Sequence, residues 1–479
     1  MEKFDAVIIG AGPAGIFTAL ELYEKQTDDF KVLVVDEGKS IYDRACPARK
    51  HGKCVRCNPC NIMSGWAGAG AFSDGKLSLS EEVGGNLTDY LPVETVREYI
   101  NYADSVYLKF GAPDLVFGKG DKKADEIAYE CSKHNIHLVK CPVRHMGTEY
   151  SYDVLRAMFD FLNAKAGFTF MAKTHADPVI SDSGEAVGAV LTDSQGNTTE
   201  VASDFVVAAP GRGGADWLSA IAKKHNINIQ NNAVDIGVRV ECPNSVMDHL
   251  TKHLYEAKMV YYSDTFENKV RTFCMNPGGI VSEEHYNEGF NNSFAKSIAV
   301  VNGHSYADED AHTENTNFAL LVSTKFTEPF NQPIEYGRYI AQLGNMLTGD
   351  KVIVQRLGDL LMGRRTDASR LKKSTTRPTL TTAIPGDLSF VLPHRHLTSI
   401  IEALRAFDHI APGLYSKNTL LYGVEVKFYS SKIDVNSSFE TAVKHLYAIG
   451  DGAGITRGLM QASVTGVIVA RDILAKLES

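Results

Sequence analysis

The chain has little that would direct it to a polyanion or a membrane. Its 479 residues carry 49 lysines and arginines against 58 aspartates and glutamates, a formal net charge of −9. This acidic balance argues against a general nucleic-acid or anionic-membrane surface. No apolar run is long enough to span a bilayer, and residues 1–5 lead into an apolar stretch without a basic region or signal core. We therefore expect a cytoplasmic protein and neither a membrane nor a nucleic-acid partner.

Fixed-period repeats and long low-complexity linkers are also absent. The composition, 44% apolar and 22% charged, is that of an ordinary globular protein, and the length allows two or three lobes. Four of the eight cysteines lie between residues 46 and 60. In a reducing compartment such a cluster favours metal binding or redox chemistry over structural disulfides.

A glycine-rich turn follows the first predicted strand, residues 5–9. The turn, residues 10–15, reads Gly-Ala-Gly-Pro-Ala-Gly and precedes an apolar-striped helix. Gly10 permits a tight turn, Gly12 lets backbone approach a pyrophosphate, and Gly15 lets the helix pack on the strand. The helix N-terminus attracts the same anion. The pattern predicts a dinucleotide-binding unit.

Three later segments extend this unit. A second strand, residues 31–35, ends in Asp36, placed to bond a ribose hydroxyl. Another buried strand ends in the small-residue turn Ala209-Pro210-Gly211, and a third ends in Gly450-Asp451 before an apolar C-terminal helix.

Together these segments resemble FAD-dependent oxidoreductases of the glutathione-reductase/succinate-dehydrogenase superfamily. The resemblance implies an α/β fold, with a discontinuous Rossmann-like FAD-binding domain and an inserted mixed α+β substrate domain. It also places the Asp451 carboxylate on the flavin ribityl chain. The middle turn departs from the superfamily's Ala-Thr-Gly pattern because Pro210 replaces the threonine.

A narrower resemblance rests on the segment 64–77, Ser-Gly-Trp-Ala-Gly-Ala-Gly-Ala-Phe-Ser-Asp-Gly-Lys-Leu. It is similar to a segment of the bacterial and archaeal family called FAD-dependent dehydrogenases, and so are pieces at 235–241, 271–279, 301–305 and 316–320. The glycines allow backbone donors to approach a phosphate or the flavin, and Lys76 could offset a reduced flavin's charge or simply be solvated. The predicted cofactor-binding residues are Gly10, Gly12, Ala14, Gly15, Asp36, Gly68, Gly70, Asp74, Lys76, Gly211, Gly450, Asp451, Arg457 and Gln461.

The predicted FAD domain is interrupted twice. Its parts are 1–90, 140–215 and 385–479, separated by a helical excursion at 91–139 and an inserted substrate domain at 216–384. Within the insert, alternating patterns predict strands at 235–241, 270–275, 297–301 and 318–323 and a helical part at 334–361. A second Gly-x-Gly-x-x-Gly and a Cys-x-x-x-x-Cys pair do not occur, so a disulfide reductase with its own nicotinamide domain is disfavoured. NAD(P)H would bind only transiently, or an electron-carrier protein would act instead.

The cysteines at positions 46, 54, 57 and 60 are the candidate metal ligands. Cys54, Cys57 and Cys60 share the Cys-x-x-Cys-x-x-Cys spacing of bacterial iron–sulfur loops. A [4Fe-4S] cluster, structural zinc, and free or redox-active thiols all remain open at this point.

Two further residues are candidates for catalysis. Cys274 ends a predicted strand and could carry a reactive thiol, although the sequence favours an inert buried cysteine. His304 follows Asn302-Gly303 in a predicted turn and could act as an acid or a base, or be held there by hydrogen bonds.

A basic stretch, residues 363–378, carries six lysines and arginines between Arg364 and Arg377. It is either a solvated connector, a clamp for an anionic substrate or donor phosphate, or an RNA contact.

The leading hypothesis is an FAD-dependent oxidoreductase that moves a hydride or an electron pair between FAD and a small organic substrate. The alternatives are an iron–sulfur/FAD electron relay, an RNA-binding or tRNA-modifying flavoprotein, and a non-catalytic flavin-bound sensor.

Overall fold

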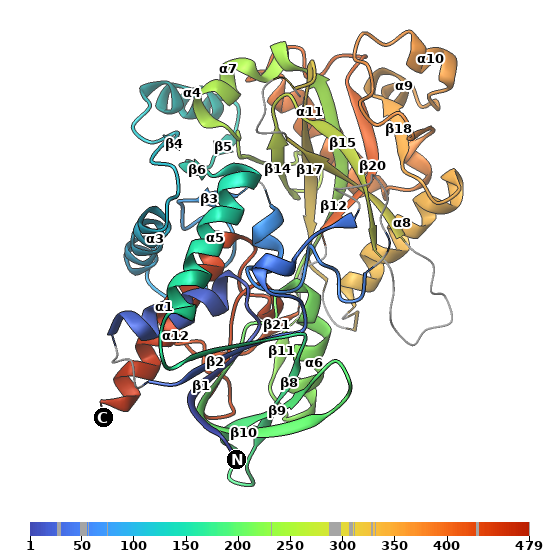
Figure 1. The fold of residues 1–479 in the computed structure, drawn as a ribbon. Coiled ribbons are helices and arrows are strands. Elements are labelled where there is room, and N and C mark those ends of the chain that lie inside the picture. The colour runs from blue at the N-terminus through green and yellow to red at the C-terminus, as the bar shows by residue number, and fades with distance from the viewer. Residues whose placement is uncertain are drawn as a thin grey trace. The chain divides into compact units, whose positions relative to one another are not determined.

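The chain divides into two compact units, each with its own sheet (Figure 1). The computed structural model describes residues 1–25, 30–47, 55, 57–73, 75–230, 232–286, 298–305, 310, 312–326, 329–330, 332–427 and 431–478. The first unit comprises Met1–Val116, Val143–Asn232 and Ser430–Ser479, and the second comprises Phe117–Pro142 and Ala233–Tyr429. Within the described residues, none of the helices combines the length and apolar content needed to cross a bilayer.

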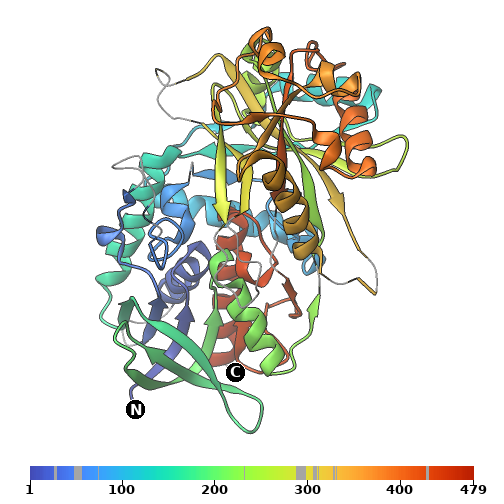
Figure 2. The same ribbon diagram turned by 90° about the vertical axis from the view of Figure 1, so that its right-hand side faces the viewer.

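A mainly parallel sheet organises the first unit. Its strands are β1 (Lys3–Ile9), β2 (Val32–Asp36), β7 (Phe168–Ala172), β8 (His175–Ile180), β9 (Ala186–Thr192), β10 (Thr198–Ala208) and β22 (Leu446–Ala448). The order is β7-β2-β1-β10, with β22 beside β10, and all of these pairs are parallel. The β8–β9 hairpin extends β10 antiparallel, as Figure 2 shows. The apolar runs of β1 and β2 are buried on both faces, which is typical of parallel strands covered by helices.

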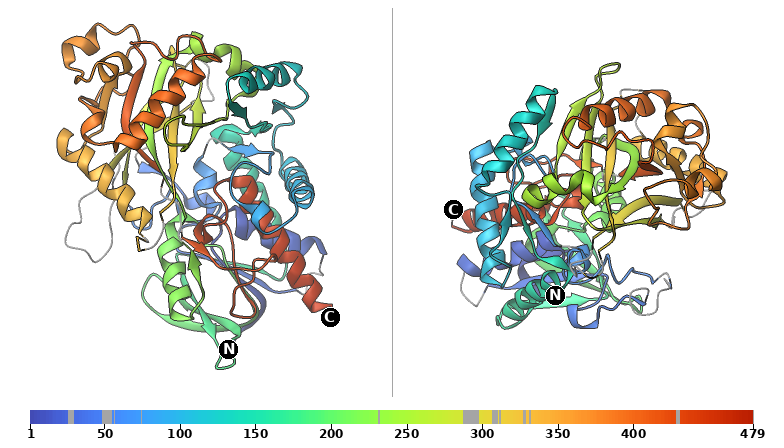
Figure 3. Two further views of the ribbon diagram at one scale, coloured as in Figure 1. Left: turned by 180° about the vertical axis from the view of Figure 1, so that it is seen from behind. Right: turned by 90° about the horizontal axis from the view of Figure 1, so that it is seen from above.

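Among the described residues, five helices accompany this sheet. They are α1 (Pro13–Lys25), α3 (Val93–Lys109), α5 (Gly147–Asn163), α6 (Ala215–Lys224) and α12 (Leu459–Leu477). Helices α1 and α12 lie side by side (Figures 1 and 3), and α12 is buried over most of its length. A side chain at Gly466 of α12 would lie 2.2 Å from the Ala14 carbonyl oxygen, so only glycine permits this approach. Shorter strands of the chain are β3 (Lys76–Ser78), β4 (Val116–Phe117), β6 (Val143–His145), β11 (Ile229–Gln230) and β21 (Lys432–Ile433).

An eight-stranded sheet organises the second unit, in the order β19-β18-β20-β12-β17-β14-β13-β5. Its strands are β5 (Ile136–Leu138), β12 (Val234–Pro243), β13 (Met259–Tyr262), β14 (Lys269–Asn276), β17 (Asn315–Thr324), β18 (Ile353–Arg356), β19 (Ile384–Pro385) and β20 (Leu420–Lys427). A hairpin of β15 (Ile280–Tyr286) and β16 (Ile298–His304) accompanies it. The helices are α4 (Lys122–Lys133), α7 (Asn244–Leu254), α8 (Pro333–Thr348), α9 (Leu357–Leu361), α10 (Ala368–Lys372) and α11 (His394–Phe407).

The central strand β12 is buried on both faces. Its residues Val234, Ile236, Val238 and Val240 belong to the apolar core of this unit. The alternate positions include Asp235, Arg239 and Glu241, which are between 0% and 2% exposed. A strand presents successive side chains to opposite faces, so these charged residues form a second, polar and buried face.

The α/β class and the Rossmann-like first sheet are confirmed by this topology, as are strands at 235–241, 270–275 and 318–323. The helical part predicted at 334–361 is partly wrong, because residues 353–356 form β18, which pairs with β20. The compact units also divide the chain at positions other than the sequence-based boundaries. Strand β20 pairs with β12 and therefore lies in the second unit, and so does β5, which pairs with β13.

Candidate functional site

Three turns meet at the carboxyl end of the parallel sheet in the first unit. A side chain at Gly10 would lie 2.1 Å from the Ala209 carbonyl oxygen, and one at Gly15 would lie 2.1 Å from the Gly10 carbonyl oxygen. These two glycines therefore allow backbone to pack on backbone, as the sequence predicted for the turn. Gly12 differs, because a side chain there would meet no heavy atom within 4 Å. The space beside Gly12, at the N-terminus of α1, is open.

The C-terminal turn joins the other two. A side chain at Gly452 would lie 2.4 Å from the Gly211 carbonyl oxygen, and one at Gly450 would lie 3.2 Å from Cβ of Ala14. Strands β1, β10 and β22 run parallel, which brings their carboxyl ends together. In open α/β sheets this edge is where ligands bind.

Asp451 lies in this turn with a defined set of partners. Its Oδ1 accepts a hydrogen bond from the Thr456 hydroxyl at 2.7 Å, and its Oδ2 lies 3.4 Å from Nε of Arg212. The Asp451 side chain is 16% exposed and that of Arg212 is 60% exposed. The Asp451 carboxylate is accessible at the edge of the sheet where the turns meet, which fits the ribityl contact implied by the resemblance. Arg212 adds a cation that the sequence analysis missed.

Asp36 ties three segments of backbone together. Its Oδ2 accepts from the Ala11 amide at 2.9 Å, and its Oδ1 accepts from the amides of Gly38 and Gly65 at 2.8 and 2.7 Å. The residue expected to bond a ribose thus fixes the nucleotide turn against the glycine-rich loop. Its contact with a ribose stays a prediction.

The glycine-rich loop packs directly on the nucleotide turn. The Ala67 amide donates to the Ala11 carbonyl at 2.7 Å, and a side chain at Gly68 would lie 3.3 Å from Cα of Gly12. Gly70 is buried, and a side chain there would lie 2.8 Å from Leu459 at the start of α12. Lys76 begins β3, opposite His145. Asp74 lies outside the described residues.

The start of α12 is tied to a neighbouring loop. The Gln461 Nε2 donates to the carbonyls of Ser78 and Ser80, each at 3.1 Å, and Gln461 is 2% exposed. The Arg457 amide donates to the Gly84 carbonyl at 2.7 Å. The hydrogen bonds of Gln461 to this loop were not predicted from the sequence. The flavin contacts of Gln461 and Arg457 stay predictions.

A buried arginine, Arg44, organises the loop that contains the cysteines. Its guanidinium donates to the carbonyls of Asn61 at 3.0 Å, Ile62 at 2.6 Å, and Trp66. Burial lowers the pKa of Arg44 to about 10, while Asp36 and Cys60 act to raise it. This role was not predicted, since an isolated arginine forms no recognisable sequence pattern.

The cysteines themselves show no metal-binding arrangement in the described part of the chain. Cys46 and Cys57 are half-buried, Cys60 is exposed, and Cys54 lies outside the described residues. Among the residues that the structure describes, no three His, Cys, Asp or Glu side chains are grouped as metal ligands would be. The described residues thus give no support to the iron–sulfur and zinc interpretations.

Cys274 and His304 both lie in the second unit. Cys274 has a positive φ of 50° at a bulge in β14, and its carbonyl accepts from Nη1 of Arg239 at 3.2 Å and from Nδ2 of Asn276 at 3.0 Å. Such a backbone conformation is rare for a non-glycine residue. His304 is exposed and is the last residue of β16, paired with Ile280, so the predicted turn is wrong. Their catalytic roles stay predictions.

The second unit has a match to a known family. Residues 233–428 match the model of the family described as "FAD-dependent protein, C-terminal domain-like". This segment is therefore similar to FAD-dependent protein C-terminal domains. The match covers the strands β12, β14, β17 and β20 and therefore the buried polar face.

The whole chain has more distant relatives. It is 27% identical over 497 residues to a Clostridium beijerinckii protein described as uncharacterized, covering 99% of this chain and 82% of that protein. Among solved structures, it is similar to Mycobacterium smegmatis Sdh1 in complex with UQ1, with a TM-score of 0.42 and 13% identity, covering 100% of this chain and 70% of that one. It is also similar to the formate oxidase of Aspergillus oryzae RIB40, with a TM-score of 0.45 and 11% identity, covering 100% and 99%.

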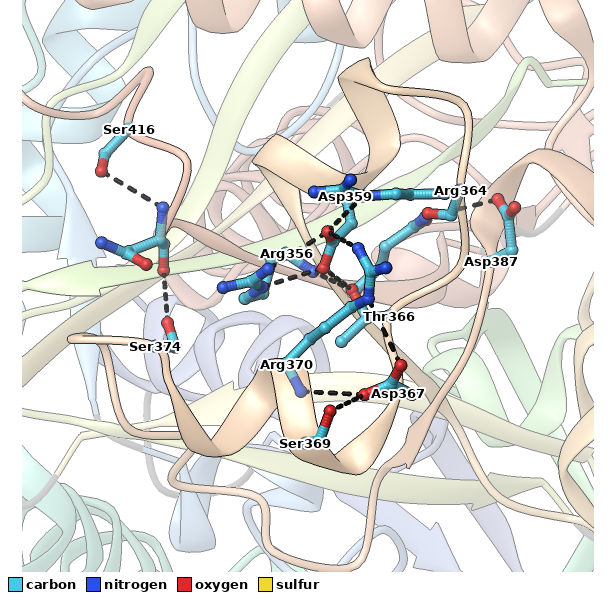
Figure 4. A network of polar contacts seen from close by, with 12 residues as sticks. Arg356, Asp359, Arg364, Thr366, Asp367, Ser369, Arg370, Ser374, Asp387 and Ser416 are labelled. Atoms are coloured by element: carbon cyan, nitrogen blue, oxygen red, sulfur yellow. Dashed lines mark hydrogen bonds and ion pairs between the residues drawn. The ribbon is translucent and has the colours of Figure 1, made fainter.

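The basic stretch, residues 363–378, folds partly onto one carboxylate (Figure 4). Asp359 is fully buried and accepts from Arg356, Arg364 and Arg370 at 2.9 to 3.1 Å and from the Thr366 hydroxyl at 2.9 Å. Burial acts to raise the pKa of Asp359, but these hydrogen bonds outweigh it and hold the pKa below its ordinary value. Arg364 and Arg370 of the stretch therefore share a buried partner, Asp359. Neither a solvated connector nor an open clamp for an anion would require such a partner.

Proposed function

We propose that the chain is an FAD-dependent oxidoreductase that transfers a hydride or an electron pair between FAD and a small organic substrate. The observation that carries the proposal is the open space beside Gly12. Gly10 and Gly15 each lack a side chain for an internal packing reason, whereas none of the residues that the structure describes fills the space at Gly12. A phosphate group at a helix N-terminus would use that space. The match of residues 233–428 to an FAD-dependent family supports the same cofactor.

The residues of the first unit fit FAD in two further respects. The Gly12–Gly15 turn supplies backbone amides for the pyrophosphate, and Asp451 supplies an acceptor for a hydroxyl of the ribityl chain. Arg212, beside Asp451, adds a positive charge at the same edge. When bound, FAD would supply the redox chemistry, since its isoalloxazine ring accepts and returns a hydride. The chain's own part is to hold that group and to position a substrate.

The first experiment measures flavin content in the purified full chain. We expect the visible absorption bands of an oxidised flavin and, after denaturation, FAD at one equivalent per chain. Gly12→Val should abolish flavin binding without unfolding the protein, because it fills only the open space. Ala220→Val, on the exposed face of α6, adds two of the same three carbons elsewhere in this unit and should leave flavin content unchanged. A folded Gly12→Val protein that retains full flavin would overturn the proposal.

A second experiment separates the catalytic proposal from a sensor. The flavin is photoreduced without oxygen and then mixed with oxygen, quinones and candidate organic acceptors. Rapid reoxidation by an organic acceptor supports an oxidoreductase, and a flavin that stays reduced with every acceptor would contradict it. Iron, zinc and sulfide analysis of the same anaerobic sample tests the cluster at Cys46, Cys54, Cys57 and Cys60. NAD(P)H is tested as a transient donor in the same way, by reduction of the flavin.

A further inference from the structure

Two cations of the second unit lie over one aromatic ring. Arg271 and Phe273 both belong to β14, two residues apart and therefore on the same face of the sheet. The Arg271 guanidinium carbon lies 4.8 Å from the centroid of the Phe273 ring, and the Nζ of Lys427, from β20, lies 5.9 Å from it. The side chains of Arg271 and Lys427 are 20% and 15% exposed, so solvent reaches both.

Each cation is fixed by a buried carboxylate. Nη2 of Arg271 donates to Asp235 at 2.6 Å, and Asp235 also accepts from the Ser323 hydroxyl at 2.6 Å. Nζ of Lys427 lies 2.9 Å from Glu425. The side chains of the two acids are 3% and 0% exposed. Because Asp235 and Glu425 are buried and cannot move to solvent, they hold Arg271 and Lys427 in position before any ligand binds.

Lys427 is not the only cation that balances Glu425. Glu425 already has a complete partner in Arg239, which donates from Nε at 2.8 Å and from Nη2 at 2.7 Å. Arg239 is fully buried, and its Nη1 donates to Asn317. Asp235 accepts a hydrogen bond from Arg271. Two cations, Arg239 and Lys427, thus face the single carboxylate of Glu425, and Lys427 is the one that solvent reaches, beside the Phe273 ring.

We propose that Arg271, Phe273 and Lys427 bind a planar organic monoanion, an aromatic or conjugated carboxylic acid. A carboxylate matches the positive charge of the solvent-accessible Lys427 and the donor geometry of the Arg271 guanidinium. A flat conjugated body packs against a phenyl ring in the offset or edge-on geometry that aromatic pairs prefer. The inference rests on the proposed function, because it names the class of substrate that the oxidoreductase would take.

The test measures binding of benzoate to the full chain by calorimetry, with and without bound FAD. Benzamide, a neutral molecule of the same shape, and cyclohexanecarboxylate, an anion without the flat ring, are the two comparisons. Benzoate should bind about tenfold more tightly than either, which corresponds to about one charge-assisted hydrogen bond. Equal binding of benzoate and benzamide, or no binding of benzoate, would overturn the proposal.

Variants locate the binding to these residues. Arg271→Gln and Lys427→Gln should each weaken benzoate binding about tenfold, and Arg271→Lys should restore part of the loss. Phe273→Leu should reduce the preference for benzoate over cyclohexanecarboxylate. Lys252→Gln removes an exposed charge on α7 and should change nothing. If Arg271→Gln weakens the fold, Lys427→Gln still decides, since an unaltered benzoate affinity there contradicts the proposal.

Failure of this inference is distinguishable from failure of the proposed function. Flavin content is read from the absorption spectrum and does not depend on benzoate. A flavin-containing protein that ignores benzoate would refute only the substrate class. A flavin-free protein that binds benzoate through Lys427 would refute only the FAD proposal.

Discussion

The carboxyl end of the parallel sheet in the first unit is built from backbone, whereas the polar face of β12 in the second unit is built from buried charged side chains. In the first region, glycines allow carbonyl oxygens to approach at distances that no side chain would tolerate. In the second, Asp235, Arg239 and Glu241 are buried and depend on partners from β14, β17, β20 and the segment after α10. The difference predicts that the two regions lose stability in different ways when altered.

The largest effect should follow from removing one half of the buried ion pair. Glu425→Gln leaves the fully buried Arg239 without its counter-charge, and we expect a loss of about 3–5 kcal/mol in the free energy of unfolding. Urea unfolding followed by circular dichroism measures it. Glu126→Gln, which breaks an exposed pair with Lys123 in the same unit, should leave the stability almost unchanged. Equal free energies of unfolding for Glu425→Gln and Glu126→Gln would contradict a large contribution of the Arg239–Glu425 pair to stability.

A smaller effect should follow from a single methyl group in the backbone-built region. Gly466→Ala would place Cβ 2.2 Å from the Ala14 carbonyl, at the contact of α1 with α12, and should cost about 1–3 kcal/mol and weaken flavin binding. Gly344→Ala in α8 is the matched control. Its Cβ would lie 3.5 Å from the nearest atom, a Val424 methyl, so the gain in helix propensity should stabilise the protein by up to about 1 kcal/mol. Thermal unfolding and flavin content together would show whether the two substitutions differ in sign.

The same contrast explains what could be predicted from sequence. The turn at 10–15 is local, because its glycine spacing prescribes strand, turn and helix within a few residues, and the α/β class followed from it. The pair Arg239–Glu425 joins residues 186 positions apart, and no sequence pattern indicates which strands become neighbours. The roles of Arg44 and Gly466 were missed for the same reason, since each depends on a segment that arrives from elsewhere. The extension of the second unit to β20 likewise follows from strand pairing that sequence spacing does not reveal.

The smallest and most selective effect concerns the second buried glutamate of the polar face. Glu241 is fully buried like Glu425, but its partners are the neutral groups of Thr379, Tyr422 and Asn315. Burial raises the pKa of Glu241 despite those hydrogen bonds. Because the pKa of Glu241 is raised in the folded state, the protonated side chain contributes its full stability to the fold below the ordinary pKa of 4.5. That contribution is lost as the pH rises through the pKa of Glu241 in the folded protein.

Glu241→Gln keeps a neutral side chain at every pH, and the Tyr422 hydroxyl can accept from the new amide. We therefore expect a change of less than about 1 kcal/mol near pH 5 and a growing advantage for the variant as the pH rises. Urea midpoints of both proteins across that range measure the difference. Glu425→Gln should behave in the opposite way, because Arg239 and Lys427 overcome burial and lower the pKa of Glu425, so its contribution is present above 4.5 and is lost on acidification. Parallel pH profiles for the wild type and Glu241→Gln would show that Glu241 is ionised in the folded protein, and the distinction between the two buried acids would then fail.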